Sequence, residues 1–133
     1  METVEATDAT VEEFAAKKRH RWQKARDSGR LIRTKDIGRQ GSHYWAPEAL
    51  TLMPQTGGYP KVYVIERLRH VRSEGVRSFE GGTMPGDAIY RIGYFTKSPK
   101  SRRWIWGQYS PLISEGDLRP LLDQARREKT IQE

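Results

Sequence analysis

Six cationic side chains crowd into the ten residues 17–26, near the start of the chain. They are Lys17, Lys18, Arg19, Arg21, Lys24 and Arg26. Binding to nucleic acid requires this density of charge, because each phosphate that a cation neutralises releases counterions and adds to the affinity. Trp22 lies inside the run and could stack on a base. The same run also fits an ordinary solvated helix face.

A second basic cluster occupies residues 97–103, which are predicted to connect two strands. Its cations are Lys97, Lys100, Arg102 and Arg103. We expect these side chains to be exposed and able to hold phosphate. Trp104 and Trp106 follow at alternate positions, so they would share one face of a strand. They could stack on bases, although Trp in this pattern is also typical of a core that faces a helix.

A third basic position, Arg39, lies within Gly38-Arg39-Gln40-Gly41. The GxxG spacing clamps a nucleotide backbone in some RNA-binding domains. Here Trp45-Ala46-Pro47 interrupts the helix that should follow, because proline disfavours helical backbone in the residue before it. We therefore interpret the segment as a loop from which Arg39 alone could contact phosphate.

Residues that could catalyse a reaction or hold a metal are sparse. On a strand, Glu66 and His70 would lie roughly 13 Å apart at ~3.3 Å per residue, too far to share a metal ion. The sequence has no Cys and no GxSxG, P-loop, HExxH or EF-hand pattern. We expect no catalytic residue, metal or cofactor. A metal-dependent nuclease is the alternative, and it would use Glu66, Glu80 or Asp87.

The charge of the chain is unevenly distributed. The formal net charge is +7, from 24 Lys and Arg against 17 acids. Five of those acids lie in residues 1–13, whereas every Lys and Arg lies after them. A basic body of this kind commonly meets nucleic acid, an anionic surface or an acidic protein. No apolar run could span a bilayer and no apolar leader begins the chain, so we expect a cytoplasmic protein without a membrane partner.

The elements that must position these residues are two helices and a sheet. Residues 1–9 are predicted to form a flexible acidic tail, and residues 10–133 a single domain. Thr10 and Glu13 fit a capping box that begins a basic amphipathic helix. Gly29 is suited to end that helix.

The strands are predicted from alternating apolar and polar residues. After an irregular segment at 30–60, with short extended pieces at 31–32 and 49–53, four strands are expected at 61–68, 76–79, 88–96 and 103–109. A closing helix should begin near Asp117. Its sheet-facing residues should be Leu118, Leu121, Leu122 and Ala125. The prediction is an α+β fold, in which a four-stranded antiparallel meander is flanked by the two helices.

The last third of the chain contains three different runs that together form a pattern: YRIGYF at 90–95, RWIWGQYSPLI at 103–113 and DLRPLLDQAR at 117–126. This arrangement resembles the C-terminal part of a family of small uncharacterised bacterial proteins. The family carries no established activity, so the resemblance implies a folded module and no mechanism.

Taken together, these patterns predict a non-enzymatic protein that binds DNA or RNA, or that accompanies nucleic acid as an accessory protein. Phosphate contacts position a protein without reading bases, so no sequence specificity is expected. The alternative is a small interaction module that inhibits or regulates an acidic partner protein. The sequence does not distinguish DNA from RNA, and it does not fix the oligomeric state.

Overall fold

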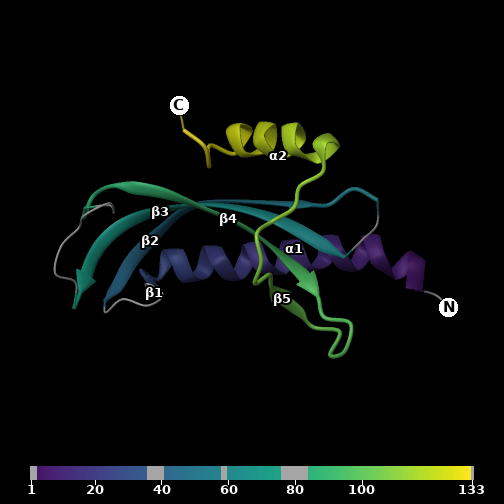
Figure 1. Ribbon diagram of the computed structural model, residues 1–133, viewed down its shortest axis with the longest axis horizontal. Helices are drawn as coiled ribbons and strands as arrows, with labels where there is room; N and C mark the ends of the chain where they lie inside the picture. The colour runs from purple at the N-terminus through teal and green to yellow at the C-terminus, as the bar shows by residue number, and fades with distance from the viewer. Residues whose placement is uncertain (1–2, 36–40, 58–59, 76–83, 133) are drawn as a thin grey trace.

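Two helices lie on opposite faces of a five-stranded antiparallel sheet whose strand order is β1-β2-β3-β4-β5 (Figure 1). The computed structural model describes residues 3–35, 41–57, 60–75 and 84–132, with side chains from Thr10 onward. In chain order the elements are α1 (Thr3–Asp27), β1 (Ile32–Lys35), β2 (Ser42–Pro54), β3 (Lys61–Glu74), β4 (Ala88–Lys97), β5 (Trp104–Trp106) and α2 (Glu115–Arg127). The α+β prediction is confirmed, whereas the predicted number of four strands is wrong.

The extra strands come from the segment 30–60, which was predicted to be irregular apart from short extended pieces at 31–32 and 49–53. It contains β1 and β2, so each of these pieces overlaps a longer strand. Pro47 lies inside β2, at a register shift against β3 between Pro47 and Ala49. On the other side of β2, the pairing with β1 ends at Trp45. Pro47 is therefore tolerated, because proline fits a strand at a bulge or where no partner strand needs its missing N–H. The predicted strand at 76–79 lies outside the described residues.

Helix α1 ends as its sequence predicts. Gly29 has a φ of +80°, and the Arg30 N–H donates to the carbonyl of Ala25 at 3.1 Å. The helix begins at Thr3, earlier than the capping box at Thr10 predicts, so helical backbone runs through most of the segment predicted to be a tail. Neither described helix is long and apolar enough to cross a membrane.

Alternation along β3 separates two layers of core. Val62 and Val64 face α1, where they pack with Val11, Leu50 and Leu52. Tyr63 and Ile65 face α2. The buried residues packed with them are Met53, Leu121 and Ala125. Each face of the sheet is thus covered by one helix, as Figure 1 shows.

Helix α2 docks through Leu121 and Ala125, which are fully buried as predicted. Leu118 is 45% exposed, so its predicted burial is wrong. The buried residue of the first turn is instead Asp117, whose carboxylate accepts hydrogen bonds from the hydroxyls of Thr56 at 2.8 Å and Tyr63 at 3.1 Å. Burial alone would raise the pKa of Asp117, but these hydrogen bonds outweigh it and hold the pKa below its ordinary value.

Both helices also contact β2 at positions after Trp45, where this edge of the strand no longer pairs with β1. Arg19 of α1 donates to the carbonyl of Leu50 at 3.1 Å, and Gln124 of α2 donates to the carbonyl of Leu52 at 3.0 Å. Glu128 joins the two, through an ion pair of 3.5 Å with Arg19 and a hydrogen bond of 3.1 Å from Gln124. We call Arg19, Gln124 and Glu128 the edge clamp.

Candidate functional site

A pocket of about 470 Å³ lies between the second half of α1 and the face of the sheet that α1 covers. We call it the helix pocket. All five strands contribute to its lining, through Ile32, Leu50, Val64, Phe95 and Trp106 among others. Its volume falls within the range of about 300–1,000 Å³ that is typical of small-ligand sites.

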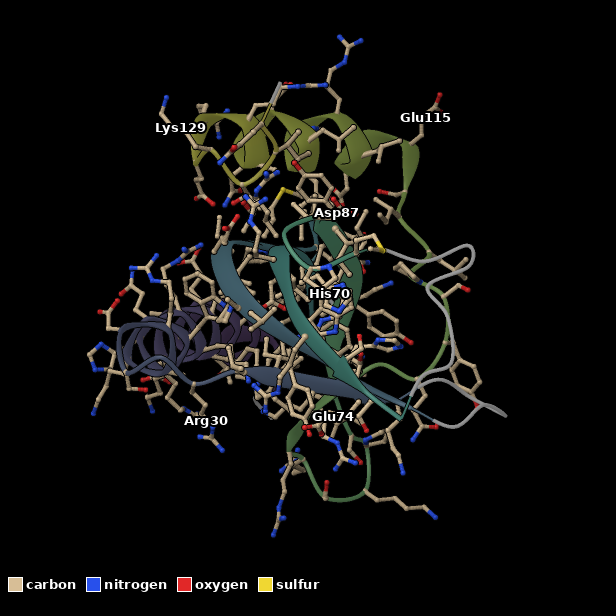
Figure 2. The ribbon with its side chains drawn as sticks, turned by 90° about the vertical axis from the view of Figure 1, so that its left-hand side faces the viewer. Arg30, His70, Glu74, Asp87, Glu115 and Lys129 are labelled. Carbon is tan, nitrogen blue, oxygen red and sulfur yellow. The ribbon has the colours of Figure 1, made fainter. Side chains whose placement is uncertain are left out.

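The helix pocket is positively charged. Its cationic side chains are Lys18, Arg21, Arg30 and Arg91, and its one carboxylate is Glu66. Arg91 is paired with Glu66 at 2.7 Å. Within the part of the chain that the structure describes, Lys18, Arg21 and Arg30 form no ion pair. Three cations of the pocket therefore have no ion-pair partner among the described residues. Figure 2, which looks along α1, shows Arg30 beside that helix with its side chain pointing outward.

Glu66 holds two walls of the pocket in place. It is only 3% exposed, and its two carboxylate oxygens are both engaged. One accepts a hydrogen bond of 2.8 Å from the indole N–H of Trp22, and the other accepts hydrogen bonds of 2.7 and 3.2 Å from Arg91. This network ties α1 to β3 and β4, so Trp22 and Arg91 are oriented before any ligand arrives.

Two aromatic rings form a corner of the pocket. Phe95 and Trp106 meet edge to face, with ring centroids 5.1 Å apart and planes at 75°. The Lys18 ammonium lies 4.9 Å from the centroid of Phe95, and the Arg91 guanidinium lies 5.4 Å from that of Trp106. Each ring therefore carries a cation close enough to interact with its π system.

The charge around Lys18 is unbalanced. Burial lowers the pKa of Lys18, and the neighbouring charges of Arg21 and Arg91 lower it further, while Glu66 acts in the opposite direction. A cation that is partly desolvated among other cations is stabilised by any anion that enters the site. The pocket thus favours a ligand that carries negative charge.

The structure brings several of the predicted site residues together. Lys18, Arg21 and Trp22 line the helix pocket. Trp104 lies beside it and stacks on Phe14 of α1, with ring centroids 4.4 Å apart. This stack fixes the basic helix next to the basic loop at 97–103, which immediately precedes Trp104.

The other cations of the helix and the loop differ in exposure and in partners. Lys17 and Lys24 are exposed on α1, as are Lys100, Arg102 and Arg103 in the loop, while Lys97 is half-buried. Two cations are already engaged: Arg19 belongs to the edge clamp, and Arg26 pairs with Asp27 at 3.3 Å. Arg39 lies outside the described residues.

The sequence did not point to Arg30, Arg91 or Phe95, and it suggested Glu66 only as a metal ligand or as part of a nuclease. A signal was present in the strands, because Arg91 and Phe95 share one face of β4 by their even spacing. The missing information was register. Glu66 pairs with Arg91 across β3 and β4, and the long connection between these strands hides that pairing in the sequence.

Two histidines that are distant in sequence meet at one end of the sheet. His43 Nδ1 and His70 Nε2 each lie 2.7 Å from the hydroxyl of Ser73. His70 is buried, with its ring 4.8 Å from that of Trp45, and Figure 2 shows it near the centre of the view, surrounded by other side chains. Among the described residues, no three His, Cys, Asp or Glu side chains gather as a metal site would require.

Comparisons with protein-family models, with curated proteins and with solved structures give no match for this chain. The resemblance of its C-terminal third to a bacterial family therefore stays a prediction.

Proposed function

We propose that the protein is a non-enzymatic nucleic-acid-binding protein. Its phosphate-binding surface consists of the exposed cations of α1, the mouth of the helix pocket and the basic loop at 97–103. The observation that carries this proposal is the group of three cations, Lys18, Arg21 and Arg30, that surround the pocket without ion-pair partners in the described structure. Cations left without protein partners are available to phosphate.

The position of the basic loop supports the same function. The stack of Phe14 on Trp104 joins α1 to the residue that follows the basic loop. This contact supports a binding surface to which both basic segments contribute. A backbone of regularly spaced phosphates can contact both segments at once. Binding of this kind is sequence-independent and weakens steeply with salt.

Fluorescence anisotropy with labelled DNA and RNA, at low and high salt, tests the proposal. The informative variant is Arg21→Ala with Lys24→Ala, because both side chains are exposed on α1. The matched control is Arg119→Ala with Arg127→Ala, which removes the same charge from exposed positions of α2 on the other face of the sheet. We expect the first variant to bind every sequence more weakly and the control to bind like the wild type. Equal loss in both variants would show that only net charge matters.

A second candidate function is supported by exposed apolar side chains on the face away from α1. Ile92 of β4 is 50% exposed and Ile105 of β5 is 45% exposed, on strands that α2 leaves uncovered. Such exposure is typical of a surface that contacts protein, which would fit an interaction module for an acidic partner. In the anisotropy experiment, this function predicts no useful affinity for either nucleic acid.

A further inference from the structure

We propose that the helix pocket binds one unstacked nucleobase together with its phosphate, so that the protein prefers single-stranded nucleic acid to duplex. This inference rests on the proposed function and names the part of the nucleic acid that enters the site. It is carried by the juxtaposition of an aromatic corner with unpaired cations in one pocket.

The aromatic corner provides surfaces for a base. Trp106 is 39% exposed at the pocket, and its ring stands edge to face with Phe95. Every base has a π face, so stacking on such rings needs no particular sequence. A duplex keeps its bases paired and stacked, and it can present only backbone to a pocket. A single strand can turn a base inward at little cost.

The cations provide the complementary site for phosphate. Arg21 and Arg30 are exposed at the pocket, and Lys18 lies deeper, over the Phe95 ring. The carboxylate of Glu66 does not repel an anion strongly, because Arg91 already neutralises it at 2.7 Å. An aromatic group with a negative charge attached therefore fits both features of the pocket, and a nucleotide has both.

The pocket is also organised in advance of binding. Trp22 is fixed by its hydrogen bond to Glu66. Trp106 is fixed by Gly93, since a Cβ at that glycine would overlap the indole ring. Walls that are already oriented lose little side-chain freedom on binding, which favours affinity.

The test measures the affinity for a labelled oligonucleotide, once as a single strand and once as a duplex of the same length, at one salt concentration. Binding of a nucleoside monophosphate is measured separately, by tryptophan fluorescence. We expect the wild type to bind the single strand about tenfold more tightly, as one stacked base implies. Trp106→Leu should weaken binding of the single strand more than binding of the duplex, and so remove this preference. Tyr109→Leu removes an aromatic side chain that is 80% exposed and does not line the pocket, so it should keep the preference.

A melting temperature for each variant shows whether it is folded. Lys18→Gln is a second variant, which removes the ammonium over Phe95 but keeps both rings of the aromatic corner. Equal affinity for single strand and duplex, with no binding of the monophosphate, would overturn the inference and leave the proposed function standing. If the protein binds the monophosphate but neither oligonucleotide, and Trp106→Leu abolishes that binding, the pocket is a nucleotide site and the proposed function is overturned. Binding of none of the three probes would overturn both.

Discussion

The indole of Trp104 lies flat on the ring of Phe14, with the ring centroids 4.4 Å apart and the planes only 11° from parallel. Phe14 belongs to α1 and Trp104 begins β5, so one aromatic contact joins the first helix to the last strand. Phe14 also meets Phe95 edge to face at 5.3 Å. This cluster sets the distance between the two basic segments of the molecule.

Phe14→Ala should therefore destabilise the protein and loosen the basic helix. We expect the free energy of unfolding to fall by roughly 2 kcal/mol, below the ~3–5 kcal/mol typical of a fully buried aromatic, because Phe14 is half-buried. Chemical denaturation followed by circular dichroism measures the change. Tyr109→Ala is the control, since its side chain is 80% exposed and its loss should change stability little.

The salt dependence of binding reflects how many phosphates the protein neutralises. If about five phosphates are neutralised, the slope of log affinity against log salt should be about −4.5 on duplex DNA and roughly −3.5 on single strands. Arg21→Ala with Lys24→Ala should make that slope shallower by about one for each phosphate that is no longer neutralised. Tight binding that does not change with salt would contradict the electrostatic basis of the proposed function.

Lys18 should make ligand binding depend on pH in the alkaline range. Burial and the charge of Arg21 lower its pKa below the ordinary 10.5, and a bound phosphate would raise it again. Binding then takes up a proton, so affinity falls as the pH rises through the pKa of the free protein. Calorimetric titrations in buffers of different ionisation enthalpy measure the uptake. Lys18→Arg keeps the charge but does not titrate in this range, so it should bind without the pH dependence.

Asp117 should contribute to stability at neutral pH and lose that contribution in acid. Its pKa is lower in the folded protein than the unfolded value of about 4, so its contribution is complete above that value. The contribution is lost as the pH falls through the folded pKa. We expect Asp117→Asn to be less stable than the wild type at pH 7 and to depend less on pH below about 4. If the melting temperatures of the wild type and Asp117→Asn change with pH in the same way, the loss of stability in acid comes from groups other than Asp117.

Gly93 should be intolerant of even a small side chain. A Cβ there would overlap the Trp106 ring, so Gly93→Ala must displace the indole, at a cost of about 1–3 kcal/mol. Tryptophan emission and thermal melting report the displacement and its cost. Gly116→Ala is a matched control, because a Cβ at Gly116 in α2 meets nothing within 4 Å. That change should be neutral or stabilising by up to ~1 kcal/mol, as alanine favours helix.

The sequence predicts what depends on local pattern and misses what depends on pairing between distant strands. The helical spacing of Leu121 and Ala125 correctly identifies the buried face of α2. The strand through Pro47 was missed because its tolerance depends on a bulge and on where β1 stops pairing. The helix pocket was missed for the same kind of reason, since Glu66 and Arg91 come together only through the register of β3 and β4.

The edge clamp has a consequence for the order of events during synthesis. Arg19 reaches the edge of β2 from an early helix, but Gln124 lies in α2 and Glu128 directly follows that helix, so both are synthesised after all of the described strands. Until then, part of the backbone of β2 can accept hydrogen bonds from another strand, and an open strand edge invites pairing between chains. The growing chain therefore keeps part of this edge open between completion of the sheet and emergence of Glu128. Chains that stop short of Gln124 should remain in that state.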